Sequence, residues 1–146
     1  MTLVLSLDPG GTTGVALTSY NDDKVELLWH KQITGSLKGF LDFHWDQLED
    51  IKFDKIVCES FTLREGVYGA DLSPVYIIGA LEALYPTTEI IYQAPFLKPL
   101  CDDTRLKRMG LYTPGRGHAM DAVRHAIIYL RNNKHIPTLR KGWLDE

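Results

Sequence analysis

The stretch Leu3-Val4-Leu5-Ser6-Leu7-Asp8-Pro9-Gly10-Gly11-Thr12-Thr13-Gly14 decides the fold of this 146-residue chain. Its first half is a short, largely apolar run that Pro9-Gly10 stops, which is typical of a buried strand. Asp8 ends the run, and a charge directly after apolar strand residues needs a partner. The glycines that follow allow two interpretations: a hairpin turn in which glycine supplies a positive φ, or a loop whose backbone N–H groups bind phosphate.

Four further strands and several helices are predicted around this stretch. The predicted strands cover 3–8, 13–20, 24–33, 54–60 and 89–93, and the predicted helices cover 36–50, 73–85, parts of 96–112 and 117–133. Three strands joined by short turns form an antiparallel meander, and strand–helix–strand crossovers make the later strands parallel. The sequence therefore predicts one α/β domain over 1–146. Its mixed five-stranded sheet has three antiparallel strands, then parallel strands, with flanking helices, which is the order of ribonuclease H-like folds.

The same patterns predict details of the helices. Ser36 is expected to cap the first helix, because serine accepts from the first free N–H groups of a helix. One apolar face of that helix is expected to carry Leu37, Phe40, Leu41, Trp45 and Leu48. The residues after 133 are expected to form a tail, since they contain Pro137 and Gly142.

Three more polar residues are placed to join Asp8. Glu59 ends a second apolar strand, and His118 and Asp121 share one face of the last long helix, one turn apart. Ligands of open α/β sheets collect at the carboxyl ends of strands, and converging carboxylates are tolerated mainly when they hold cations. The alanine after each of the two helix residues would let that helix press against the sheet. The four residues therefore predict a divalent-metal site that handles phosphate.

Simpler interpretations of these residues stay open. Glu59 could pair with an arginine such as Arg64. Asp121 could simply interact favourably with the positive N-terminal end of its helix dipole. His125 lies one further turn along the same helix face and fits a structural histidine better than a metal ligand.

Composition is that of a soluble globular protein, with 45% hydrophobic and 24% charged residues. Cys58 and Cys101 show no zinc-site spacing, and Cys58 is expected to be a buried free thiol. No segment approaches the roughly 18–20 apolar residues of a membrane span, and no signal-peptide pattern is present. We expect no membrane partner and a cytoplasmic location, which is the host cytoplasm if a phage encodes the protein.

Charge is distributed unevenly along the chain. Residues 105–146 hold nine Lys or Arg against three acidic residues, a net of +6, whereas the other 104 residues hold 7 basic and 16 acidic residues, a net of −9. A basic surface beside an acidic metal site would give this asymmetry, and such a surface suits DNA phosphates.

At this point the chain resembles the RuvC-like Holliday junction resolvases, in the shorter form that bacteriophages carry. The resemblance covers most of the chain. Its carriers are Leu7-Asp8-Pro9-Gly10 with Gly14, Cys58-Glu59-Ser60, Tyr92-Gln93-Ala94-Pro95 and His118-Ala119-Met120-Asp121-Ala122-Val123. It implies a homodimer that cleaves branched double-stranded DNA with Mg²⁺, which Mn²⁺ can replace.

The resemblance assigns catalysis and metal binding to Asp8, Glu59, His118 and Asp121. Two metal ions at such a site serve phosphodiester hydrolysis, and His118 is either a ligand or a proton donor. Residues expected to contact DNA are Arg64, Tyr68, Lys98, Arg105, Lys107, Arg108 and Arg116. Phe61, with Tyr68, could wedge open a junction. The dimer contact is expected on Ile77, Ile78, Leu81 and Leu84.

Other functions remain as alternatives. A fork or flap nuclease, or an exonuclease of the same fold, would use similar carboxylates, although a proofreading-type exonuclease would place Glu at Gly10. An actin-like ATPase or sugar kinase also begins with Asp-x-Gly-x-Thr, but the second phosphate loop of that class is not visible. A non-catalytic DNA-binding or scaffold protein would not need all four polar residues.

Overall fold

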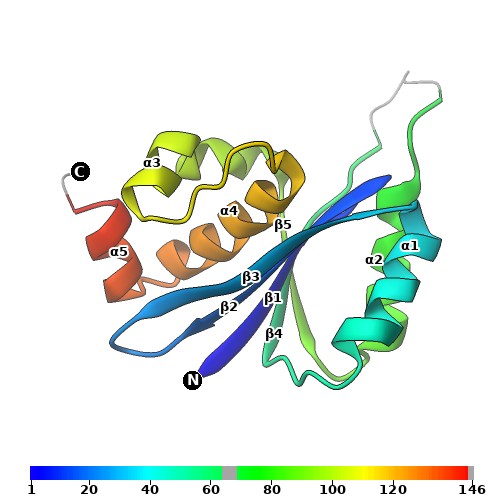
Figure 1. Cartoon of the computed structure of the whole chain (residues 1–146), viewed down its shortest axis with the longest axis horizontal. Coiled ribbons are helices and arrows are strands. Elements are labelled where there is room, and N and C mark those ends of the chain that lie inside the picture. The colour runs from blue at the N-terminus through cyan, green and yellow to red at the C-terminus, as the bar shows by residue number, and fades with distance from the viewer. Residues whose placement is uncertain (64–68, 145–146) are drawn as a thin grey trace.

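The five strands form one mixed sheet in the order β3-β2-β1-β4-β5 (Figure 1). In the computed structural model, which describes residues 1–63 and 69–144, the strands are β1 (Thr2–Asp8), β2 (Thr12–Tyr20), β3 (Val25–Thr34), β4 (Lys55–Glu59) and β5 (Glu89–Gln93). The β1–β2 and β2–β3 pairs are antiparallel, whereas the β1–β4 and β4–β5 pairs are parallel. The predicted fold class is confirmed.

Helices cover both faces of the sheet (Figure 1). On one face lie α1 (Ser36–Phe43), which continues into a π-helical turn (His44–Leu48), and α2 (Ser73–Leu84). On the other face lie a 3₁₀ helix, η2 (Pro95–Cys101), with α3 (Asp103–Arg108), α4 (Gly117–Asn132) and α5 (Ile136–Gly142). None of the helices within 1–63 and 69–144 combines the length and the apolar composition of a membrane span.

The central strand β1 is buried on both faces, which explains its apolar run. Val4 belongs to the core between the sheet and α4, whereas Leu5 and Leu7 belong to the core between the sheet and the α1–α2 layer. Because both cores close over β1, its carboxyl end is held firmly in the middle of the molecule. Asp8 stands at that end.

Two expectations for the first helix are wrong. Ser36 does not cap it: its φ is 53°, its hydroxyl donates to the Ser73 hydroxyl at 2.6 Å, and Gly35 takes the cap position at a φ of 91°. Trp45 does not face the core, because it is 53% exposed. The π-helical turn His44–Leu48 changes the helical phase there and places Trp45 on the outside.

The expected C-terminal tail is also corrected, because Ile136–Gly142 forms α5. Pro137 lies in the first turn of that helix, where its missing N–H has no intrahelical partner to lose. A proline that was interpreted as a sign of irregular chain therefore starts a helix.

The expected dimer face of α2 is wrong for two of its four residues. Ile77 and Leu81 are fully buried in the core of this chain, so they are not available to a partner. Ile78 and Leu84 pack against the same core but are only partly buried. The exposed apolar residues at the start of α2 are Leu72, Val75 and Tyr76.

Candidate active site

Sheet register places Asp8 beside Glu59. β1 and β4 run parallel with Leu7 paired to Cys58, so the next residue of each strand lies at the same edge of the sheet. Only 8% of Asp8 and 9% of Glu59 is exposed. Cys58, which directly precedes Glu59 in β4, is a buried free thiol, as predicted. Two carboxyl groups therefore meet in a largely dry position.

The start of α4 completes the cluster. His118 Nδ1 lies 3.7 Å from Asp8 Oδ2, and the Asp121 side chain lies one turn further along the helix. The helix comes this close because β2 has glycine at position 14. A Cβ there would stand 1.8 Å from the carbonyl oxygen of His118. Gly14 is therefore needed for close approach of the α4 backbone to the sheet.

A glutamine from the sheet holds the first turn of α4. Gln32 Oε1, on β3, accepts hydrogen bonds from the backbone N–H groups of His118 at 3.0 Å and Ala119 at 3.2 Å. Free N–H groups at a helix start are usually satisfied by a local cap, but α4 has no side-chain cap of its own. The position of His118 therefore depends on β3, a dependence with no local sequence signal.

Two cations neutralise the acidic cluster. Lys98 Nζ, from η2, lies 2.9 Å from Glu59 Oε1 and 3.3 Å from Asp121 Oδ2. Arg124 donates to Asp121 Oδ1 at 2.9 Å and also pairs with Asp103. Lys98 was expected to contact DNA, but in this structure it bridges two of the predicted metal ligands.

The protonation of the carboxyl groups reflects this crowding. Burial, together with the hydrogen bond and negative charge of Glu59, raises the pKa of Asp8 to about 9. Burial alone would also raise the pKa of Glu59, but hydrogen bonds from His125, Asp8 and Lys98 outweigh it and lower that pKa. Asp8 is thus the protonated partner and Glu59 the ionised one.

The donor set suits a hard divalent cation. Within 1–63 and 69–144, no three His, Cys, Asp or Glu side chains already surround a metal-sized position. The ammonium of Lys98 contacts two of the carboxylates and supplies the positive charge that an ion would bring. Carboxylate oxygens are the ligands that Mg²⁺ prefers, and Asp8, Glu59 and Asp121 supply them from neighbouring positions.

A buried histidine supports Glu59 from behind. Gln93, paired with Glu59 across β4 and β5, donates through Nε2 to His125 Nδ1 at 3.1 Å and to the His125 carbonyl at 2.9 Å. His125 then presents its other ring nitrogen, as an N–H, 3.4 Å from Glu59 Oε1. His125 is therefore fully buried, held by Gln93, and close enough to Glu59 to influence its orientation. Gln93 lies in the segment 92–95 that resembles the resolvases, but the sequence did not predict its role.

The residues expected to bind DNA lie in different places. Arg105 and Arg108 both donate to the Gly142 carbonyl and tie α3 to α5, and Arg105 also lies over the Trp143 ring. Lys107 lies over the Tyr112 ring, and Arg116 directly precedes α4. Arg64 and Tyr68 fall outside the described residues. The basic third of the sequence thus contributes partly to internal packing.

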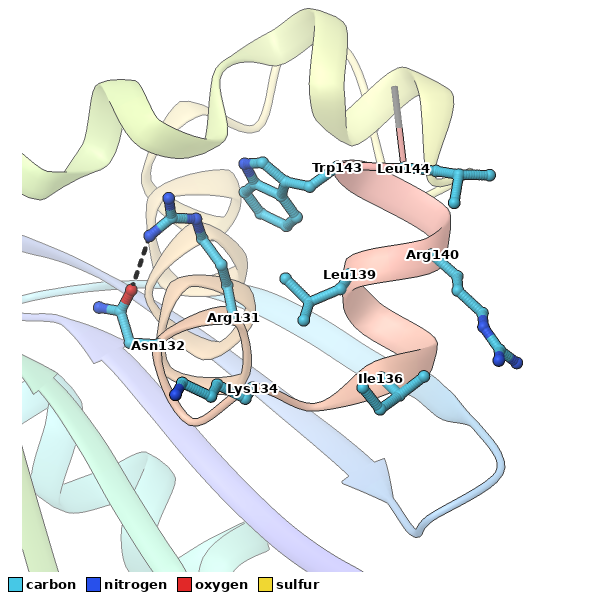
Figure 2. A pocket seen from close by; sticks show the side chains of 8 residues that line it. All are labelled: Arg131, Asn132, Lys134, Ile136, Leu139, Arg140, Trp143 and Leu144. Atoms are coloured by element: carbon cyan, nitrogen blue, oxygen red, sulfur yellow. Dashed lines mark hydrogen bonds between the residues drawn. The ribbon is translucent and has the colours of Figure 1, made fainter. Parts of the chain in front are cut away.

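A cavity of about 870 Å³ lies between the end of α4 and α5 (Figure 2). Its basic side chains are Arg131, Lys134 and Arg140, beside the apolar Leu139 and Trp143. It adjoins the last turn of α4, whereas His118 and Asp121 are in the first turns, about 20 Å away along a 16-residue helix. This cavity is therefore separate from the acidic cluster.

The sheet order and the acidic edge define a ribonuclease H-like fold of the kind seen in Holliday junction resolvases. Matching structures include T. thermophilus RuvC in complex with a Holliday junction substrate, at a TM-score of 0.71 and 13% identity over 94% of this chain and 98% of that one. The fowlpox virus Holliday junction resolvase matches at a TM-score of 0.60 and 10% identity over 90% and 99% of the two chains. No family model and no curated protein matches the sequence.

Proposed function

We propose that this protein is a divalent-metal-dependent endonuclease of branched double-stranded DNA, with the Holliday junction as its preferred substrate. The observation that carries the proposal is the convergence of Asp8, Glu59 and Asp121 at one sheet edge, with His118 3.7 Å from Asp8. RuvC, which shares the fold, is seen in complex with a Holliday junction. Buried carboxylates at that edge are what a phosphodiester-hydrolysing site requires.

The carboxylates of Asp8, Glu59 and Asp121 would hold Mg²⁺, or Mn²⁺ in its place. Bound ions would supply Lewis acidity and charge stabilisation for phosphodiester hydrolysis. Lys98, which contacts both Glu59 and Asp121, offsets part of the negative charge of these two carboxylates. The side chain of His118 is 54% exposed, so it can reach the substrate and give a proton to the leaving oxygen.

We also propose that two copies pair through α2. A junction has two symmetric strands to cut, so one site per copy implies a twofold dimer. The exposed side chains of Leu72, Val75 and Tyr76 form an apolar surface at the start of α2. Gly79 and Ala83, exposed further along the helix, are small enough for close approach of a second helix.

The test is cleavage of a labelled substrate panel in Mg²⁺, in Mn²⁺ and in EDTA. The panel holds a four-way junction, a fork, a flap, a linear duplex and an RNA–DNA hybrid of matched sequence. Paired symmetric cuts in the junction, absent in EDTA, are expected. Cutting of the fork or flap alone would favour a different nuclease of the same fold. Cutting that persists in EDTA, or ATP hydrolysis without cutting, would contradict the proposal.

A further inference from the structure

A pocket of about 740 Å³ lies against the candidate active site, between η2 and the start of α3. Its apolar wall consists of Pro95, Phe96 and Pro99. Phe96 is 79% exposed, the highest exposure of any large apolar side chain in the described part of the chain. A single exposed phenylalanine is unremarkable by itself, so its neighbours decide what it means.

The pocket shares two walls with the acidic cluster. Lys98 lines it and contacts Glu59 at 2.9 Å, and Arg124 lines it and donates to Asp121 at 2.9 Å. Because these two residues belong to both, a DNA strand whose phosphate binds at these carboxylates places a neighbouring nucleotide within reach of the pocket. That strand is the occupant that the geometry offers.

The chemistry of the pocket favours a base over a phosphate. Its two cations are already engaged, Lys98 with two carboxylates and Arg124 with Asp121, Asp103 and the Cys101 carbonyl. Its other charged residues, Asp102 and Asp103, would repel a phosphate. What remains is an exposed aromatic ring between two prolines, which suits the flat apolar face of a nucleobase.

We propose that this pocket holds a nucleobase next to the scissile phosphate, taken out of its stack and placed on the ring of Phe96. The inference rests on the proposed function and adds a residue that selects where the cut falls. At the centre of a junction a base has lost part of its normal stacking, so moving it onto a protein ring costs less there than in a continuous duplex. The pocket thereby helps to distinguish branched from linear DNA.

The test is a double-mutant cycle between Phe96 and the base. Wild type, Phe96→Ala and Phe96→Trp are each bound, in Ca²⁺, to a junction that is intact or abasic at one position flanking the cut. Phe96→Ala should weaken binding to the intact junction about tenfold, which is the size of one lost base–ring stack. Phe96→Trp should retain binding. On the junction with the relevant abasic position, Phe96→Ala should cause no further loss. Trp45→Ala is the matched control for these binding measurements, because Trp45 is another exposed aromatic, on the π-helical turn after α1, and its loss should leave affinity unchanged.

A second measurement is independent of any variant. Wild type bound to a junction carrying 5-iodouracil at each flanking position in turn is irradiated, and the cross-linked residue is mapped by mass spectrometry. A cross-link at Phe96 from one position is expected.

The possible failures are distinguishable. One failure concerns the pocket alone. If wild type cuts junctions, but the losses of binding free energy from Phe96→Ala and from the abasic site are additive at every flanking position, the pocket assignment is wrong. The proposed function then stands. A cross-link at other residues only would have the same meaning. If wild type neither binds nor cuts branched DNA, the proposed function fails, and this inference fails with it.

Discussion

Among single residues, Asp8 is the one whose environment conflicts most with its charge. It is buried beside Glu59, and its pKa is raised to about 9 by that burial and by the neighbouring negative charges. Lys98 reduces the conflict but does not remove it, because its direct contacts are with Glu59 and Asp121. A fold that keeps a carboxyl group in such a position gives up stability, which is typical of functional sites.

Asp8→Asn should abolish cleavage while leaving binding intact or tighter. The substitution removes a metal ligand, and a loss of at least about 10²-fold in rate is expected from losing one essential electrostatic group. It also removes a negative charge that repels phosphate. Cleavage rates in Mg²⁺ and junction affinity in Ca²⁺ measure the two effects. Asp23→Asn, in the turn after β2, is the control, and undiminished turnover of Asp8→Asn would reject the site.

The same substitution should stabilise the metal-free protein. Because the pKa of folded Asp8 lies above its unfolded value of 3.8, the folded state holds the extra proton, and stability falls as pH rises from about 4 towards 9. Asn removes this penalty and can still donate to Glu59. A gain of about 1–3 kcal/mol is expected at pH 8, with little gain at pH 4. Thermal melting in EDTA measures it, and equal gains at both pH values would contradict the explanation.

Among the helices and strands, α4 contributes the most residues to the candidate active site. Its first turn is fixed by the close approach at Gly14 and by the Gln32 side chain, and its middle is joined to β5 through Gln93 and His125. These contacts come from β2, β3 and β5, so three strands set the position of one helix. Small changes in any of them should move His118 and Asp121 relative to Asp8.

Gly14→Ala should displace the start of α4. It should reduce the cleavage rate strongly, while the protein as a whole stays folded. The new Cβ would meet the His118 carbonyl at 1.8 Å, so backbone must shift, and a cost of about 1–3 kcal/mol is typical of such overpacking. Gly117→Ala is the matched control in α4, since a Cβ there meets nothing within 4 Å. Cleavage rate and thermal melting are measured for both. Equal activity of the two variants would show that the close approach is unimportant.

Gln93→Leu should weaken metal binding without unfolding the protein. Without the amide, the Nδ1 of His125 loses its donor, and the ring no longer favours the tautomer that presents N–H to Glu59. Losing such a supporting group typically costs about 10–100-fold in metal affinity. Isothermal titration calorimetry with Mn²⁺ measures the metal affinity and does not depend on cleavage. Wild-type affinity in the variant would mean that His125 does not orient Glu59.

For the whole molecule, the proposed function requires two copies, and α2 is the helix proposed to join them. The core-facing side chains of α2 belong to this chain alone, and the exposed side chains at its start are the ones free for a second copy. In Figure 1, α1 and α2 form the layer on the opposite side of the sheet from α4. A pairing through α2 would therefore leave the α4 side of each copy open to DNA.

Tyr76→Glu should give a folded monomer that nicks a junction but does not make paired cuts. Tyr76 is 54% exposed, so the charge costs the single chain little but would be buried in a dimer. Sedimentation gives the oligomeric state, and a cruciform plasmid distinguishes nicked from linear product. Trp45→Glu, an exposed aromatic on the π-helical turn, is the control. A wild type that is monomeric at micromolar concentration and makes paired cuts would refute the arrangement.

The sequence alone determined which segments are strands, that three antiparallel strands precede the parallel ones, and which polar residues end them. Those features are local: an apolar run, a proline or glycine that stops it, and a helical spacing of three between His118 and Asp121. Hydrophobic periodicity indicates what each segment is, and the strand–helix–strand crossovers then indicate that the later strands are parallel. The mixed sheet and the meeting of Asp8 with Glu59 follow from that information.

Only the tertiary structure decided what surrounds those residues. Gln32 reaches His118 across 86 positions of sequence, and Lys98 enters the acidic cluster from a 3₁₀ helix. The exposed face of α2 likewise depends on which of its sides the sheet covers. Such facts arise when distant segments pack, and no local pattern encodes them, because each side chain is compatible with several partners until the fold selects one.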